Sequence, residues 1–317
     1  MFCFDYTVPP DVSGQPRLDK YIVTVQSTLN RSQLKSGATQ LLVNGKPAKL
    51  SYKIRPGDTI HVAWEDSVPD DIIPEDIPLA ILYEDENVTV VNKRQGMVTH
   101  PAAGNWSGTL VNALLFHRGS PAVPVADAAA LRPGIVHRLD KDTSGIIITA
   151  NNRRAEEWLQ EQFQSRHVRK EYIAIVSGRP PHAAGDIRTG FIRDPRDRQK
   201  WKATADTAQG KYARTIYHCI GTFGPYSLMR LRIKTGRTHQ IRVHMKYIGC
   251  PVLGDPLYNA RKETLFADAP LMLHARLLGI RLPGSTEYTV FTAPVPARFK
   301  RVLHVLKAKY PKELPHD

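Results

Sequence analysis

Residues 134–148 constrain the fold of this 317-residue chain more than any other stretch. The last three of them are isoleucines, a β-branched block that predicts a buried strand. Gly145 permits a sharp backbone turn directly before that strand. The polar residues that precede Gly145 are therefore expected on a loop at a strand end, where a rigid scaffold can present functional side chains.

Asp140 is the candidate catalytic residue of this loop. It lies between Arg138 and Lys141, and the hydroxyl groups of Thr143 and Ser144 follow it closely. Neighbouring cations favour the ionised form of a carboxylate, which can then act as a nucleophile or a base. The alternative is that Asp140 is a turn residue whose side chain binds its own backbone, which is the commonest role of Asp in such loops.

Charge and cysteine content indicate the kind of partner and the compartment. The chain has 44 Lys and Arg against 30 Asp and Glu, a formal net charge of +14. Such an excess predicts a polyanionic partner, most simply nucleic acid. Three widely separated cysteines form no paired metal motif and are typical of a reducing compartment. Since no secretory signal or long apolar run is evident, we expect a cytoplasmic protein without a membrane span.

Residues 137–145, which read HRLDKDTSG, resemble the signature of the RluA-type pseudouridine synthases. Similarity to that family runs from about residue 79 to 300. Four further segments match it, at 108–114, 170–172, 236–244 and 254–258. The resemblance implies an α+β fold in which helices flank a mixed, largely antiparallel sheet. It also implies an isomerase that converts uridine to pseudouridine within RNA, with no metal and no cofactor.

The same resemblance implies roles for single residues. Asp140 matches the family's carboxylate, which either attacks the nucleotide or takes its proton. Arg242 matches the arginine that positions this carboxylate, and Tyr172 matches the aromatic residue that packs on the detached uracil. Arg138 matches the side chain that fills the gap left by the flipped nucleotide. The alternative for Arg138 is an ion pair with Asp142.

Residues 17–64 predict a separate small unit. Apolar residues at helical spacing predict a helix at 17–29, a second short helix follows, and a strand enters an Asn44-Gly45 hairpin turn. This order resembles the alpha-L RNA-binding module of ribosomal small-subunit protein four. The alternative is a capping domain with ordinary surface lysines. The resemblance implies phosphate contacts by Arg31, Lys35 and Lys46.

The domain organisation follows from these units. We expect the RNA-binding module at residues 1–64 and the catalytic domain at 79–317. Residues 65–78 combine six acidic residues with three prolines and predict an extended linker. We expect the protein to be a monomer.

Within the catalytic domain, the spacing of apolar and capping residues predicts alternating strands and helices. Helices are expected at 109–117, after a cap at Asn151 or Asn152, at 235–247 and at 297–309. Strands are expected within 80–93 and at 146–148, 170–176, 213–218, 227–233, 271–278 and 288–291.

Residues 186–202 are predicted to be irregular. Six basic residues there outnumber three acidic ones, and Trp201 lies among them. Basic residues interleaved with an aromatic are typical of RNA contact, so Arg198 and Lys200 are candidate RNA-binding residues. The alternative is an exposed, solvated loop.

These observations favour an RNA pseudouridine synthase, most simply one that acts on large-subunit ribosomal RNA. The alternatives are a transfer RNA pseudouridine synthase, a non-catalytic RNA-binding assembly factor of the same fold, or a glycosidase that releases free uracil. The presence of Asp140, Tyr172 and Arg242 argues against the non-catalytic alternative.

Overall fold

The computed structural model describes residues 2–12, 14–25, 34, 38–64, 71–102, 104–124, 132–197, 199–259 and 265–313. The chain divides into two compact units, each of which is described by itself. The smaller consists of Met1–Ile73, Pro101–Ser107 and Pro121–Ala129. The larger consists of Pro74–His100, Gly108–Ser120 and Ala130–Asp317.

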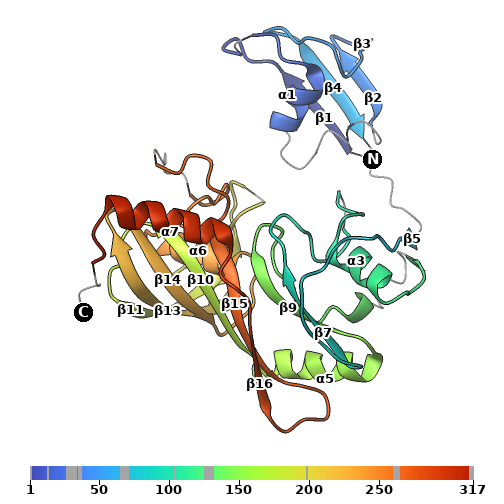
Figure 1. The fold of residues 1–317 in the computed structure, drawn as a ribbon. Helices are drawn as coiled ribbons and strands as arrows, with labels where there is room; N and C mark the ends of the chain where they lie inside the picture. The colour runs from blue at the N-terminus through green and yellow to red at the C-terminus, as the bar shows by residue number, and fades with distance from the viewer. Residues whose placement is uncertain are drawn as a thin grey trace. The chain divides into compact units, whose positions relative to one another are not determined.

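A ten-stranded sheet forms the centre of the larger unit (Figure 1). Its strands are β6 (Ile81–Glu84), β7 (Val88–Lys93), β9 (Ser144–Ala150), β10 (Arg169–Ser177), β11 (Ala184–Arg193), β12 (Trp201–Thr204), β13 (Lys211–Phe223), β14 (Tyr226–Ile233), β15 (Leu273–Arg281) and β16 (Tyr288–Thr292). The order is β12-β11-β13-β14-β10-β15-β9-β7-β6, and β16 pairs with β15. Only the pair of β9 and β15 is parallel among the described strands.

Among the described residues, the α-helices that accompany this sheet are α3 (Leu110–His117), α5 (Arg153–Gln164), α6 (Gln240–Tyr247) and α7 (Ala297–Lys309). Thr109 caps α3 in a reciprocal arrangement with Asn112, and Asn152 caps α5 by accepting from the Ala155 N–H. Such side chains satisfy N–H groups that have no partner within the helix. No helix in the described part of the chain is long and apolar enough to cross a membrane.

Strand β9 is buried along its whole length, which confirms the strand expected at residues 146–148. Ile146 and Ile148 pack in one cluster with Ala155 and Leu159 of α5. Gly145, the second residue of this strand, has a φ of +119°, and a Cβ there would lie 2.2 Å from the carbonyl oxygen of Ala275 in β15. Only glycine fits this close parallel pairing. Residue 145 therefore sets how the loop before β9 joins the sheet.

The α+β class and the largely antiparallel sheet are as predicted, but two local predictions were wrong. Residues 186–202 were expected to be irregular, yet β11 and β12 occupy most of them. The charges lie on the exposed side of β11, where Asp186 pairs with Arg188 and with Arg214 of the neighbouring strand. Helix α6 begins at Gln240 instead of residue 235, because His239 has a left-handed backbone conformation.

The smaller unit has a four-stranded antiparallel sheet with the order β1-β4-β2-β3, and its described helix is α1 (Leu18–Val25). The strands are β1 (Phe2–Thr7), β2 (Ala38–Val43), β3 (Lys46–Pro47) and β4 (Thr59–Trp64). A separate short pair joins β5 (Asp71–Ile72) to β8 (Val123–Pro124). The buried residues of one core cluster are Val8, Leu18, Ile22, Leu34, Val43, Ile54, Ile60 and Val62.

The hairpin turn predicted from Asn44-Gly45 is confirmed. Both residues have positive φ, 51° and 74°, as the preferred two-residue hairpin turn requires. The expected second helix falls, apart from Leu34, outside the described residues. Arg31 and Lys35 also fall outside them.

Candidate active site

Asp140, Tyr172 and Arg242 line one cavity of about 380 Å³ in the larger unit. Asp140 comes from the loop before β9, Tyr172 from β10, and Arg242 from the first turn of α6. The fold therefore brings together three side chains that are far apart in sequence and that the sequence analysis singled out.

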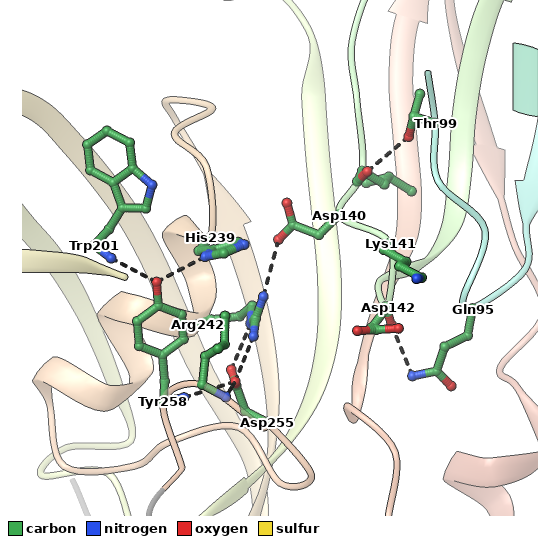
Figure 2. Close-up of polar contacts among 12 residues, drawn as sticks. Gln95, Thr99, Asp140, Lys141, Asp142, Trp201, His239, Arg242, Asp255 and Tyr258 are labelled. Carbon is green, nitrogen blue, oxygen red and sulfur yellow. Dashed lines mark hydrogen bonds and ion pairs between the residues drawn. The ribbon is translucent and has the colours of Figure 1, made fainter. Parts of the chain in front are cut away.

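A buried ion pair fixes the orientation of Arg242. Its Nε and Nη2 donate to the two carboxylate oxygens of Asp255, each at 2.7 Å. Its Nη1 lies 3.9 Å from Oδ2 of Asp140 (Figure 2). Burial lowers the pKa of Arg242, but the hydrogen bonds and charge of Asp255 outweigh it, so the pKa is raised. Because bidentate pairing fixes a guanidinium, Arg242 presents a steady positive charge to Asp140.

Tyr172 supplies a neutral aromatic ring to the cavity. It is 8% exposed, and the pairing of β10 with β15 changes register between Glu171 and Tyr172. An irregularity of this kind redirects a side chain from its regular position in the strand. Burial raises the pKa of the Tyr172 hydroxyl, and the charge of Asp140 raises it further. The phenol therefore stays protonated beside a carboxylate.

Three side chains, from the last residue of β7 and the segment that follows it, hold the Asp140 loop by its carbonyl groups. Thr99 donates to the carbonyl oxygen of residue 139 at 2.9 Å, and Gln95 donates to that of residue 142 at 3.0 Å. Lys93 donates to the carbonyl oxygen of residue 141 at 3.2 Å. Figure 2 shows the first two of these contacts. These residues were not predicted from the sequence because they precede their loop partners by 40 to 48 positions, and no local pattern links them.

His137 ties the same loop to β9. Its Nε2 accepts from the Ile148 N–H at 3.0 Å, and its ring stacks on Phe163 at a centroid distance of 4.5 Å. Burial, and secondly the charge of Lys170, lower the pKa of His137 to about 3. The imidazole is therefore neutral at physiological pH, and the hydrogen bond to Ile148 already uses its lone pair. His137 supports the loop and is not available as a base.

The predicted RNA contacts have different positions. Arg138 is exposed and lines the cavity with Asp140. Lys46 is exposed on β3 of the smaller unit. Lys200 forms an ion pair with Asp197 at 2.9 Å. Arg198 lies outside the described residues.

A second cavity, of about 160 Å³, shares wall residues with the first, among them Phe163, Lys170 and Arg237. Burial lowers the pKa of Lys170, and burial together with the charge of Arg232 lowers that of Lys234. The shifts come from burial of Lys170 and from the cations around Lys234, so positive charge is concentrated at this cavity and suits a polyanion. The Lys and Arg residues that line this second cavity are called the basic rim below: Arg166, Arg169, Lys170, Arg232, Lys234 and Arg237.

Comparison with known proteins gives consistent matches along the chain. The family model described as RNA pseudouridylate synthase matches residues 87–247. A Bacillus subtilis protein named uncharacterized RNA pseudouridine synthase YlyB is 41% identical over 293 residues, which cover 92% of this chain and 94% of that protein. The ribosomal large subunit pseudouridine synthase D of Borreliella burgdorferi is 41% identical over 289 residues, which cover 89% of this chain and 87% of that protein.

Solved structures share the fold. Human RNA pseudouridylate synthase domain containing 4 aligns with a TM-score of 0.57 at 27% identity, covering 75% of this chain and 95% of that one. Human RNA pseudouridylate synthase domain containing 1 aligns with a TM-score of 0.55 at 24% identity, covering 76% and 97%. The region matched by the family model contains Asp140, Tyr172 and Arg242. The chain therefore belongs to the RNA pseudouridylate synthase family, as an RluA-type isomerase that acts on RNA.

Proposed function

We propose that this enzyme isomerises specific uridines in the RNA of the large ribosomal subunit. The relative from Borreliella burgdorferi, which carries that activity in its name, aligns over 89% of this chain. The net charge of +14 and the basic rim favour a large polyanionic substrate. A transfer RNA substrate is the competing possibility, and the experiment below includes it.

The observation that carries the proposal is the meeting of Asp140, Tyr172 and Arg242 around one cavity. Isomerisation breaks the bond between ribose C1′ and uracil N1 and makes a bond between C1′ and C5. A proton leaves C5 and a proton is taken up at N1, so the reaction needs no redox step. Asp140 starts the cleavage, either by attacking the nucleotide or by taking its proton.

Two neighbouring groups assist this carboxylate. Arg242, which Asp255 orients, keeps the Asp140 side chain in place and balances its charge. Tyr172 packs on the detached uracil and retains it in the cavity while the base turns. Retention matters because the same base must rejoin the same sugar, so loss of the uracil would leave an abasic site.

The target uridine must leave its RNA helix before it can reach Asp140. Extrusion of a paired base costs a few kcal/mol. Arg138, exposed on the cavity wall, fills the gap that the uridine leaves. The basic rim binds the adjacent phosphates, as an A-form RNA is recognised mainly through its backbone and shape.

The smaller unit acts as an alpha-L RNA-binding module in this proposal. Its antiparallel sheet and helix α1 have a common core, and Lys46 is exposed on β3 beside the Asn44-Gly45 turn. Lys46 is therefore available to a phosphate. We expect the protein to work as a monomer in the cytoplasm.

Transcripts of large-subunit ribosomal RNA and bulk transfer RNA, both free of modification, provide the test. Each is treated with the wild-type protein, with Asp140→Asn or with Asp142→Asn, and pseudouridine is mapped by chemical labelling and primer extension. We expect pseudouridine in the ribosomal RNA with the wild type and with Asp142→Asn, and none with Asp140→Asn. Asp142→Asn is the matched control, because it neutralises a second carboxylate of the same loop. Modification confined to transfer RNA would contradict the substrate, and equal modification by Asp140→Asn would contradict the mechanism.

A further inference from the structure

His239 has an unusual backbone conformation at the entrance to α6. Its φ and ψ are 57° and 17°, in the left-handed region, and its side chain makes no capping hydrogen bond to the helix. Glycine adopts this conformation most readily, and asparagine, aspartate and histidine adopt it more often than other residues. Ser, Thr, Asp and Asn are also the usual residues at the start of a helix. Glycine, Asn or Asp would suit this backbone at least as well, so the reason for histidine here lies in its side chain.

A chain of two hydrogen bonds determines which nitrogen of His239 carries the proton. The backbone N–H of Trp201 donates to the hydroxyl oxygen of Tyr258 at 3.0 Å. The same hydroxyl lies 2.9 Å from Nδ1 of His239 (Figure 2). A backbone N–H can only donate, so the Tyr258 oxygen accepts there. Its own proton then has His239 Nδ1 as its acceptor among the described residues.

Both groups are in the protonation states that this arrangement requires. Tyr258 is 2% exposed, and burial is the main cause that raises its pKa, so the phenol keeps its proton. Burial also lowers the pKa of His239. At physiological pH the imidazole is therefore neutral, with an accepting Nδ1 and a proton on Nε2.

The Nε2–H group faces the cavity that contains Asp140. His239 lines this cavity together with Asp140 and Tyr172. Figure 2 shows the ring nitrogen remote from Tyr258 turned toward the Asp140 side chain. In the described part of the chain, this nitrogen has no hydrogen-bond acceptor. A donor with a fixed direction thus stands free in the wall of the active site.

We infer that His239 donates a hydrogen bond from Nε2 to a carbonyl oxygen of the extruded uracil, and that Tyr258 positions it for this task. The inference rests on the proposed function and names a contact to the substrate base. Uracil offers two carbonyl acceptors, O2 and O4. When the bond to C1′ breaks, its electron pair stays on the base and spreads to these oxygens. A donor already in place stabilises that charge more than it stabilises the ground state.

Three variants separate this role from a structural one. His239→Gly removes the imidazole but suits the left-handed backbone, so its melting temperature should fall only slightly, through the one hydrogen bond that the Tyr258 hydroxyl loses. The single-turnover rate on the target RNA should fall roughly 100-fold, which is typical when an enzyme loses one hydrogen-bond donor to a developing negative charge. RNA affinity should change by less than about twofold. His239→Asn suits the same backbone and restores a shorter donor, so it should be faster than His239→Gly. Tyr258→Phe leaves the imidazole free to choose its tautomer and should cost about tenfold.

Substitution of single atoms in the substrate identifies the partner of His239. The wild type and His239→Gly are assayed on the same RNA with uridine, 2-thiouridine or 4-thiouridine at the target, since sulfur accepts hydrogen bonds poorly. One thio-substitution should slow the wild type but have little further effect on His239→Gly, because the interaction is already absent.

Two results would overturn the inference: equal rates of the wild type and His239→Gly on uridine RNA, or additive losses with both thio-substrates. Absence of pseudouridine with the wild type would instead count against the proposed function.

Discussion

The buried pair of Arg242 and Asp255 provides the sharpest test of how this site is held. The Asp255 side chain has no exposed surface, and its Oδ1 also accepts from the N–H groups of Leu257 and Tyr258 at 2.9 and 3.0 Å. Asp255→Ala therefore removes the partner of a guanidinium that is only 5% exposed. Among the described residues, Asp140 at 3.9 Å is then the nearest carboxylate to Arg242.

The expected loss of stability is large. Removal of one partner from a buried ion pair costs about 3–5 kcal/mol. The two N–H groups add roughly 1 kcal/mol or more if they stay without acceptors. We expect Asp255→Ala to lower the free energy of unfolding by about 5 kcal/mol, which for a domain of this size corresponds to a fall of roughly 10–20 °C in Tm.

Asp255→Asn is the matched control, because its amide oxygen can still accept from the two N–H groups while the charge is lost. Its effect should be about half as large. Circular dichroism during heating and urea titration measures both variants, and single-turnover assays measure the reaction. Both should react more slowly than the wild type, with RNA affinity retained, because Arg242 loses its fixed orientation but stays buried. A loss below about 1 kcal/mol for Asp255→Ala would refute this account of the pair.

Three further predictions concern the loop and the basic rim. Burial lowers the pKa of Lys93 to about 7, so between about pH 7 and 10 the folded state binds fewer protons than the unfolded state. The free energy of unfolding should therefore rise as the pH is raised through this window, and the gain should disappear as the pH falls again. Lys93→Met should make the free energy of unfolding less dependent on pH, as measured by urea titrations at a series of pH values. Gly145→Ala would place a Cβ 2.2 Å from the Ala275 carbonyl oxygen at a φ of +119°, so we expect destabilisation by more than about 3 kcal/mol. An unchanged melting temperature would contradict this. Lys234→Glu and Arg232→Glu should each weaken RNA binding and reduce the slope of log affinity against log salt concentration by about one. Filter binding at several salt concentrations measures this slope, and the same slope as the wild type would mean that the residue contacts no phosphate.

Local patterns predicted the elements whose structure depends on neighbours in sequence. The isoleucines at 146–148 read as a buried strand because branched apolar side chains suit a sheet covered on both faces, and β9 is such a strand. Asn44 and Gly45 predicted their turn because few other residues adopt positive φ. The resemblance at residues 137–145 identified Asp140 before any geometry was known.

Local patterns of this kind did not predict strand β11. The density of charge across residues 186–202 suggested a solvated loop, because one strand taken alone shows no partner for its charges. In the fold, Asp186 lies opposite Ile216 on β13 and forms an ion pair with Arg214 of that strand, so its charge is balanced across the sheet. Pairing between strands that are distant in sequence decided this element.

By itself, the sequence determined the strand and loop around Asp140, the hairpin at Asn44-Gly45 and the excess of positive charge. Only the tertiary structure decided that Arg242 meets Asp140, that Lys93, Gln95 and Thr99 hold its loop by carbonyl groups, and that Tyr258 directs the proton of His239. The reason is physical. Backbone preferences act over a few residues, whereas these contacts join segments whose distance depends on strand register and on how the sheet and its helices pack.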